Sequence, residues 1–306
     1  MSVAHPDLSV EIAGLTLRNP IMSASGTFGY GMEYEPYLDL SKLGAIVTKA
    51  VTLEAREGNP PPRVRETPAG MLNAIGLQNP GGHVFIREKL PRLREFGVPV
   101  IVNISGRSVD EFARLAEMLS VEGVDALEVN ISCPNVEDEG MTFGVDCEMT
   151  GGLTEAVCNA TDLPVIVKLS PNVTDITVIA QAAEQAGADA LSLINTLLGM
   201  SIDIERRRPH LGNATGGLSG PAIRPVAVRM VHQVAGAVDL PLIGMGGVMT
   251  ASDALELILA GATAVAVGTA NFVEPGTMEQ VIRGLADYCR RHQVKRITDL
   301  VGAVEV

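Results

Sequence analysis

The chain holds five lysines against eighteen arginines, and two of these lysines stand near the ends of short apolar runs. Lys49 belongs to the run Ala45–Ala50, and Lys168 to the run Pro164–Ser170. A single lysine in such a place is most simply a side chain that reaches the surface. Two of them favour a ligand-facing role, because a charge at the end of a buried run needs an anionic or hydrogen-bonding partner.

Three asparagines occupy equivalent places. Asn103, Asn130 and Asn195 lie at or near the ends of the apolar runs Val98–Ile104, Ala126–Ser132 and Ala190–Asn195. Each amide offers both donors and acceptors, which suits the edge of a planar heterocycle or a cyclic amide. Each could alternatively cap the end of a strand, so the indication comes from the three together.

Cys133 directly follows the run Ala126–Ser132, and Pro134, Asn135 and a loop containing Gly140 and Gly144 come after it. A cysteine within an apolar strand is usually a small buried hydrophobe. One just past a strand end, before a loop able to close over a substrate, is a better candidate for a reactive thiolate.

The other three cysteines, Cys147, Cys158 and Cys289, suggest only structural roles. Neither the cysteines nor the five histidines show the spacing of a disulfide framework or a metal site. Free thiols fit a reducing cytosol, so we expect a cytoplasmic protein without a bound metal.

Two glycine-containing turns predict a phosphate site. Gly246-Gly247 precedes a helix expected to start near Thr250, and Gly268-Thr269 follows the last apolar run. In a barrel of alternating strands and helices, the loops after strands seven and eight commonly bind phosphate through backbone N–H groups and a helix N-terminus. Ordinary tight turns are the simpler alternative for each of the two turns taken alone.

These residues require a scaffold that brings strand ends together. Eight short apolar runs predict buried parallel strands: Pro20–Ser25, Ala45–Ala50, Val98–Ile104, Ala126–Ser132, Pro164–Ser170, Ala190–Asn195, Leu240–Gly246 and Ala264–Gly268. Segments of helical period separate most of them, starting at Ser108 (with Glu111 as a capping box), near Thr174, near Thr250 and near Thr277. The inward-facing residues expected in the second and third of these helices are Ile176, Ile179, Ala180, Ala183, Ala254, Leu255, Ile258 and Leu259, and those in the last are Val281, Leu285 and Cys289.

This alternation favours a single α/β domain over residues 1–306, a (β/α)8 TIM barrel. A doubly wound open sheet is the main alternative, but the GxGxxG turn usual after its first strand is missing. The alternating segment Leu8–Leu17 around Ala13-Gly14 predicts an N-terminal β-hairpin at the barrel floor. The long Pro- and Gly-rich stretch Val51–Gly82 predicts a βα-loop insertion over the active site.

The charge and the apolar content of the chain limit the kinds of partner that it could bind. The net charge is 23 − 36 = −13, which argues against nucleic acid or an anionic membrane surface. The N-terminus has no signal-peptide pattern, and no apolar run approaches the ~20 residues that span a bilayer. We therefore expect a small-molecule enzyme that uses neither nucleic acid nor membrane.

Seven motifs together resemble class 1 dihydroorotate dehydrogenases over essentially the whole chain. They are Ala24-Ser25-Gly26-Thr27-Phe28-Gly29, Thr48-Lys49-Ala50, Gly58-Asn59-Pro60, Asn73-Ala74-Ile75-Gly76-Leu77-Gln78-Asn79-Pro80-Gly81, Asn130-Ile131-Ser132-Cys133-Pro134-Asn135, Val167-Lys168-Leu169-Ser170-Pro171 and Gly216-Gly217-Leu218-Ser219-Gly220. The segment Asn135 to Gly144 is more similar to class 1B, the catalytic subunit of the NAD-linked enzyme, than to the fumarate-using class 1A.

The resemblance implies oxidation of dihydroorotate to orotate in pyrimidine synthesis, with one FMN per chain. It implies flavin contacts from Ser25, Lys49, Ala50, Asn103, Asn130, Lys168, Ile194, Gly220, Gly246, Gly247, Gly268 and Thr269. It implies substrate contacts from Lys49, Asn73, Ala74, Ile75, Gly76, Leu77, Asn130, Asn195 and Thr196, with Cys133 as the catalytic base. It also implies a homodimer joined by a separate FAD and [2Fe-2S] subunit in a heterotetramer. This chain itself shows no second nucleotide motif and no cluster-type cysteines that could relay electrons to NAD.

Elementary chemistry agrees with these roles. A thiolate can take the C5 proton near neutral pH because its reference pKa is about 8.5. Lys49 would offset the substrate carboxylate, and Lys168 would stabilise negative charge on the reduced flavin ring. The alternatives are a related FMN dihydropyrimidine dehydrogenase acting on dihydrouracil, the fumarate-using class 1A enzyme, a cysteine-dependent purine nucleotide dehydrogenase without flavin, and an inert scaffold barrel.

Overall fold

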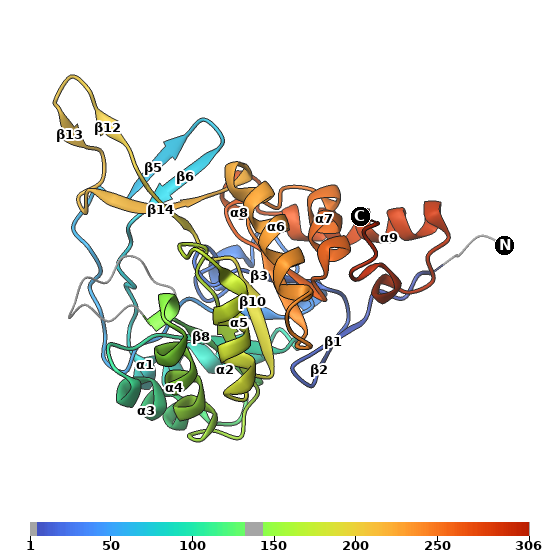
Figure 1. Cartoon of the computed structure of the whole chain (residues 1–306), viewed down its shortest axis with the longest axis horizontal. Helices are drawn as coiled ribbons and strands as arrows, with labels where there is room; N and C mark the ends of the chain where they lie inside the picture. The colour runs from blue at the N-terminus through green and yellow to red at the C-terminus, as the bar shows by residue number, and fades with distance from the viewer. Residues whose placement is uncertain (1–4, 132–142, 306) are drawn as a thin grey trace.

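A computed structural model of the chain describes residues 5–131 and 143–305 and confirms the (β/α)8 TIM barrel (Figure 1). The barrel strands are β3 (Ile21–Ser23), β4 (Ile46–Val47), β7 (Val100–Ile104), β8 (Ala126–Asn130), β9 (Val165–Lys168), β10 (Ala190–Leu193), β15 (Leu242–Met245) and β16 (Ala264–Val267). They pair in parallel in the order β3-β16-β15-β10-β9-β8-β7-β4. A parallel bridge between Met22 and Ala45 brings the two ends together and closes the ring. Each strand falls within one of the eight predicted apolar runs.

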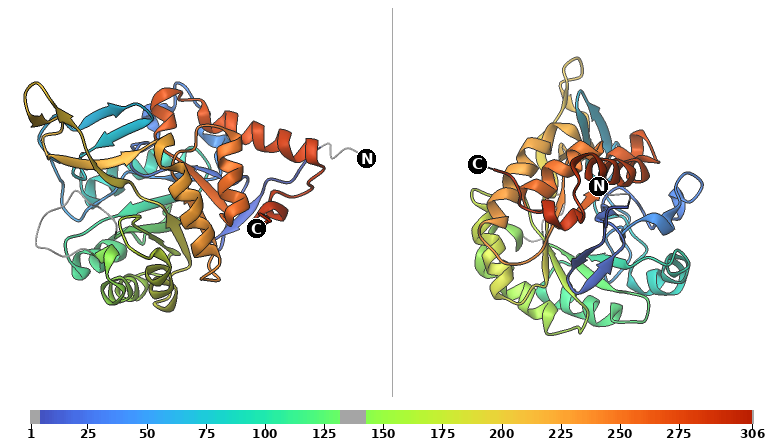
Figure 2. Two further views of the ribbon diagram at one scale, coloured as in Figure 1. Left: turned by 45° about the horizontal axis from the view of Figure 1, so that its top comes forward. Right: turned by 90° about the vertical axis from the view of Figure 1, so that its right-hand side faces the viewer.

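Helices surround these strands, and the right-hand view of Figure 2 shows them as an outer ring. They are α1 (Gly82–Val84), α2 (Leu90–Arg94), α3 (Val109–Leu119), α4 (Cys147–Cys158), α5 (Ile176–Gln185), α6 (Arg224–Ala235), α7 (Ala251–Ala260), α8 (Ala270–Val273) and α9 (Thr277–His292). A π-helical stretch, η3 (Phe85–Lys89), joins α1 to α2. Short 3-10 turns form η1 (Met32–Tyr34), η2 (Leu40–Lys42), η4 (Phe143–Val145), η5 (Pro221–Ile223) and η6 (Ile297–Leu300).

The predicted helix starts are correct to within two residues, but the caps differ in detail. The α3 cap is only half of a capping box: Ser108 accepts from the Glu111 backbone N–H at 3.2 Å, while the Glu111 carboxylate accepts from Arg107 N instead. In α7, Thr250 forms a complete capping box with residue 253. Leu259 was expected to face inward but is half-buried.

The remaining inward faces agree with the prediction. Buried positions on α5 are Ile176, Ile179, Ala180 and Ala183, and those on α9 include Val281, Leu285 and Cys289. On α7, Leu257 is buried in addition to Ala254, Leu255 and Ile258. These stripes pack onto the barrel strands and form its main hydrophobic core.

The N-terminal hairpin is present and lies at the barrel floor. Strands β1 (Val10–Ile12) and β2 (Leu15–Leu17) pair antiparallel around Ala13 and Gly14, whose φ angles are 48° and 75°. Two consecutive positive φ values are typical of the tight turn that matches strand twist. The hairpin buries Val10 and Leu17 in the main core, and it faces the viewer in the right-hand view of Figure 2.

A second antiparallel sheet, which the sequence did not predict, stands at the opposite end (Figure 1). It consists of β5 (Val64–Thr67), β6 (Gly70–Asn73), β14 (Thr215–Ser219) and β11 (Leu197–Met200), in the order β11-β14-β6-β5. A further small hairpin pairs β12 (Ile202–Asp203) with β13 (Arg208–Pro209). The Val51–Gly82 insertion thus folds back over the carboxyl ends of the barrel strands, where active sites of such barrels lie.

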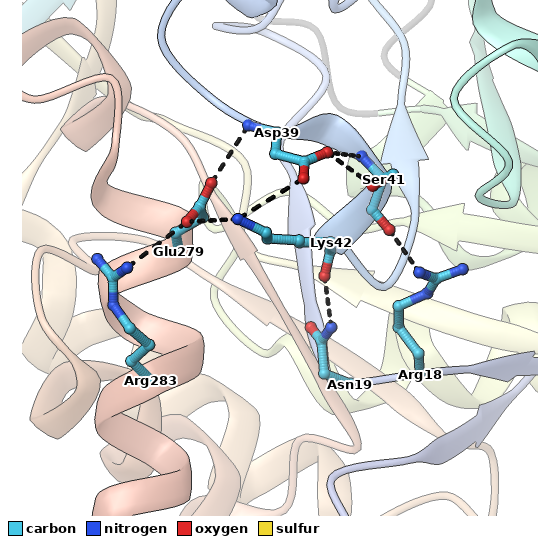
Figure 3. Close-up of polar contacts among 7 residues, drawn as sticks. All are labelled: Arg18, Asn19, Asp39, Ser41, Lys42, Glu279 and Arg283. Carbon is cyan, nitrogen blue, oxygen red and sulfur yellow. Dashed lines mark hydrogen bonds and ion pairs between the residues drawn. The ribbon is translucent and has the colours of Figure 1, made fainter.

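The stretch between β3 and β4 contains 3-10 turns where a barrel helix would usually stand, and polar contacts hold it in place (Figure 3). Glu279 of α9 accepts from Asp39 N at 3.2 Å and from Lys42 Nζ at 3.3 Å. On the other side, Arg92 of α2 pairs with Glu35 at 2.7 Å. Lys42 is therefore an exposed surface lysine, and its ion pair with Glu279 links the stretch between β3 and β4 to α9 with little expected effect on stability.

Helices within the described ranges are all too short or too polar to cross a membrane.

Candidate active site

Two adjoining pockets open at the carboxyl ends of the barrel strands, and they share Gly26, Thr27, Lys168, Asn195, Thr196 and Ser219. Including the part open to solvent, they enclose about 550 Å³ and 760 Å³, the size range of cofactor and substrate sites. The first is lined by Lys168, Ile194, Gly220, Gly246, Gly247, Gly268 and Thr269 among the predicted flavin residues. The second is lined by Ser25, Lys49, Ala50, Asn73, Ile75, Gly76, Leu77, Asn103, Asn130, Asn195 and Thr196.

The wall of the first pocket depends on glycine. Gly246 and Gly247 have φ angles of 125° and 77°, in the region that side chains rarely adopt. A Cβ on Gly247 would stand 2.6 Å from Arg224 Cβ. Gly268 differs, because its backbone is ordinary and a Cβ would only approach Ala24 and Thr27, two lining residues, to 3.5 Å. Bare backbone can therefore approach an anionic ligand from both loops.

An internal carboxylate holds the turn that leads into α7 (Ala251–Ala260). The Asp253 carboxylate accepts from Met249 N at 3.0 Å and from Thr250 N at 2.8 Å, and it is paired with Arg224. The two amides of the turn that leads into α7 are thus bonded to a carboxylate from the first turn of the helix. The Gly246–Met249 loop lines the first pocket, whereas Thr250 does not.

Lys49 is half-buried at the second pocket and forms no ion pair with the described residues. Burial lowers the pKa of its ammonium below the ordinary value, the charge of Glu33 opposes this, and that of Arg63 lowers the pKa further. A desolvated cation beside an open pocket is suited to an anionic ligand group.

Lys168 stands where the two pockets meet, and a residue that the sequence analysis missed lies beneath it. Lys168 Nζ donates to Ser25 Oγ at 3.0 Å and lies 3.6 Å from the carboxylate of Glu128 in β8. Glu128 is 1% exposed and also accepts from Asn103 Nδ2 at 2.6 Å and from Ser192 Oγ at 2.8 Å. The detectable signal was a glutamate inside the apolar run Ala126–Ser132, since a buried carboxylate requires partners.

Asn103 has one unused hydrogen-bonding atom. Its Oδ1 is buried and has no partner among the described residues, whereas its Nδ2 is held by Glu128. Asn103 lines the second pocket. A buried acceptor without a partner at a pocket wall indicates a place for a ligand N–H group.

The segment Asn73 to Leu77 forms one wall of the second pocket. Asn59 N donates to Ile75 O at 3.0 Å, and a Cβ on Gly76 would stand 2.5 Å from Asn59 Oδ1. Ala74 is the one residue of this segment that lines neither pocket; it is buried behind the wall with Leu72 and Leu211. Its backbone is used internally, since Ala74 N donates to Arg63 O and Ala74 O accepts from Asn59 Nδ2.

Several lining residues were not predicted, namely Ala24, Gly26, Thr27, Ser219, Ile223, Met245, Val248, Met249, Ala266 and Ala270. Most are small or apolar and carry no signal of their own in the sequence. Cys133 and the loop residues up to 142 lie outside the described residues, whereas Gly144 lies in η4. Within the described part of the chain, no group of three or more His, Cys, Asp or Glu side chains could hold a metal ion.

Comparison with known proteins agrees with this architecture. A sequence model of the family described as dihydroorotate dehydrogenase matches residues 7–288. The chain is similar to proteins named dihydroorotate dehydrogenase B (NAD(+)), catalytic subunit: 64% identical to that of Desulforudis audaxviator over 96% of both chains, and 56% identical to that of Geotalea daltonii over 99% of this chain and 100% of the relative. The corresponding protein of Pelobacter propionicus is 58% identical over 98% of this chain and 99% of its own length. The resemblance to class 1B is thereby confirmed, and the chain belongs to the dihydroorotate dehydrogenase family of oxidoreductases.

Proposed function

We propose that this chain is the catalytic subunit of an NAD-linked dihydroorotate dehydrogenase that oxidises dihydroorotate to orotate in pyrimidine synthesis. The relatives that bear this name match nearly the full length of the chain. The single observation that carries the proposal is the pair of adjoining pockets with Lys168 at their junction.

The residues present fit FMN. A flavin mononucleotide has an anionic phosphate at one end and a ring with imide groups at the other. Gly246, Gly247, Gly268 and Thr269 would hold the phosphate, with Ile194 and Gly220 beside them. Ser25, Ala50, Asn103, Asn130 and Lys168 would meet the ring, where the unpartnered Asn103 Oδ1 suits an imide N–H. When bound, FMN supplies the hydride acceptor.

The second pocket fits a small carboxylated dihydropyrimidine. Lys49 provides a cation for the carboxylate, and the amides of Asn73, Asn130 and Asn195 match ring amides, with Thr196 nearby. Ile75 to Leu77 would cover the substrate and keep water from it. A dihydrouracil-type substrate would leave Lys49 without a partner, which favours dihydroorotate.

Cys133 is proposed as the base on its sequence motif. Its thiolate would take the C5 proton while the C6 hydrogen leaves as hydride to the flavin, so that the substrate loses two electrons and two hydrogens and becomes orotate. We also propose that electrons then pass to NAD through a separate subunit with FAD and a [2Fe-2S] cluster, on a homodimer of this chain in a heterotetramer. A cytoplasmic location stays a prediction.

Anaerobic mixing with dihydroorotate tests the proposal. Bound flavin should bleach with dihydroorotate and much less with dihydrouracil. The isolated chain should not reduce NAD efficiently. Preference for dihydrouracil, or a colourless protein that cannot be reconstituted with FMN, would contradict the proposal.

Cys133→Ala provides the matched test of the base. This variant should keep bound flavin but lose most of its reduction by dihydroorotate, because the proton acceptor is gone while the cofactor pocket is unchanged. Near-normal reduction at neutral pH would remove Cys133 from the mechanism.

A further inference from the structure

Four neighbouring barrel strands each contribute one polar side chain to a single buried network beneath the pockets. These are Asn103 of β7, Glu128 of β8, Lys168 of β9 and Ser192 of β10, and all four are at most 4% exposed. Interior layers of such barrels are usually filled by branched apolar side chains. A polar layer directly below a ligand site therefore calls for an explanation beyond packing.

Glu128 is the centre of this layer. Its Oε2 accepts from Asn103 Nδ2 at 2.6 Å and lies 3.6 Å from Lys168 Nζ, and its Oε1 accepts from Ser192 Oγ at 2.8 Å. Asn103 and Lys168 both reach the pockets, whereas Glu128 lines neither. Glu128 can therefore act on a ligand through the positions of these two neighbours and through the charge that it contributes to the local field.

Glu128 determines which way the Asn103 amide faces. An ionised carboxylate only accepts hydrogen bonds, so it must meet the NH2 side of the amide. The opposite side, Oδ1, is then left as an acceptor without a partner among the described residues. An amide held in this orientation accepts an imide N–H and presents no donor in the same position.

Glu128 also sets the charge at the junction of the pockets. Lys168 alone would place a full positive charge beside the ligand, and the carboxylate at 3.6 Å balances it. Lys168 then acts mainly as a hydrogen-bond donor. The paired lysine stabilises the reduced, more negative flavin ring less than an unpaired lysine would.

We propose that Glu128 is a positioning residue of the cofactor site: it orients the Asn103 amide as an acceptor for a ligand imide and balances Lys168, which keeps the reduction potential of the bound flavin low. This inference rests on the proposed FMN function. It assigns to Glu128 no contact with flavin or substrate.

Glu128→Gln tests the charge, with Ser23→Ala as the control. Ser23 is equally buried in β3, and among the described residues its hydroxyl bonds only the backbone of Val47, to O at 3.0 Å and from N at 2.9 Å. Glu128→Gln should raise the affinity for reduced over oxidised FMN at least tenfold, which for a two-electron couple is a rise in midpoint potential of about 30 mV. Ser23→Ala should leave the potential unchanged. A loss of stability in both variants with no change in potential would show that Glu128 is merely structural.

Asn103→Ala separates the two effects. Glu128→Gln should also weaken the binding of oxidised FMN severalfold, but not in a chain that already carries Asn103→Ala, because the acceptor is then absent. The rise in potential should persist there, since it acts through Lys168. An equal loss of FMN affinity in both backgrounds would overturn the role in orienting the amide.

Ser192→Ala keeps the proposal testable if Glu128→Gln does not fold. Removal of the Ser192 hydroxyl withdraws a donor from the carboxylate, which should lower the potential, opposite in sign to Glu128→Gln and smaller. An unchanged potential would overturn the charge-setting role. Wild-type protein that binds no FMN at all would instead refute the proposed function, and the two failures are thus distinguishable.

Discussion

Replacement of Lys168 by Met should destabilise the protein through the charge that it leaves behind. Met has a similar length and no charge, so the barrel interior stays filled. Glu128, which is 1% exposed, would lose the only cation within ion-pair distance of it in the described residues. Loss of one partner of a buried pair costs about 3–5 kcal/mol, because the other charge stays buried and uncompensated.

The structure places the expected cost near the lower end of that range. Glu128 keeps its hydrogen bonds from Asn103 at 2.6 Å and Ser192 at 2.8 Å, which continue to stabilise the carboxylate. The expected loss in the free energy of unfolding is therefore ~3 kcal/mol. For 306 residues, an unfolding entropy of about 2.1 cal/mol/K per residue gives ~0.64 kcal/mol/K, so Tm should fall by ~5 °C.

Urea unfolding of flavin-free protein measures this directly, and the double variant Lys168→Met with Glu128→Gln is the control. A buried pair replaced by neutral side chains of similar shape is often tolerated, so the double variant should lie within about 1 kcal/mol of wild type. Equal unfolding free energies for the single and double variants would refute the reasoning, because the unpaired carboxylate could not then be the cause.

Three further outcomes follow from the site. Gly247→Ala should lower both the Tm and the affinity for FMN, because φ is 77° and the new Cβ would stand 2.6 Å from Arg224. Gly268→Ala should lower the affinity for FMN with little change in Tm. Fluorescence titration and thermal unfolding would measure the two effects. Lys49→Met should raise the KM for dihydroorotate. It should also raise the Tm of flavin-free protein at pH 7, because burial lowers the Lys49 pKa and the wild-type fold must therefore hold an unfavourable charge. This difference in Tm should disappear as the pH approaches 10.5, where the lysine loses its charge in the unfolded chain as well. At pH 8, iodoacetamide should label exposed Cys147 much faster than Cys158, because burial and the nearby Asp189 charge raise the Cys158 pKa to about 11. Mass spectrometry would measure the two labelling rates, and equal rates would contradict this expectation.

The barrel itself could be predicted because local signals and tertiary structure agree. Each buried parallel strand is a short apolar run, and Thr250 starts α7 with a capping box that local sequence specifies. The second sheet could not be predicted in this way. It pairs Asn73 with Gly217 across 144 residues, and glycines in β14 give no alternating apolar pattern.

The same difference separates the two halves of the candidate site. Side chains at strand ends, such as Lys49 and Asn195, could be predicted because parallel strands bring their carboxyl ends together regardless of the loops. Glu128 was not predicted as a site residue because it stands two residues before the end of β8. Its only signal in the sequence is that a polar residue interrupts an apolar run. The role of Glu128 depends on its partners on three other strands, Asn103, Lys168 and Ser192, and no local sequence pattern specifies these contacts. A charged residue in the interior of a predicted barrel strand is therefore as informative as one at its end, since the cost of burial requires partners, and two of the partners of Glu128, Asn103 and Lys168, line the pockets.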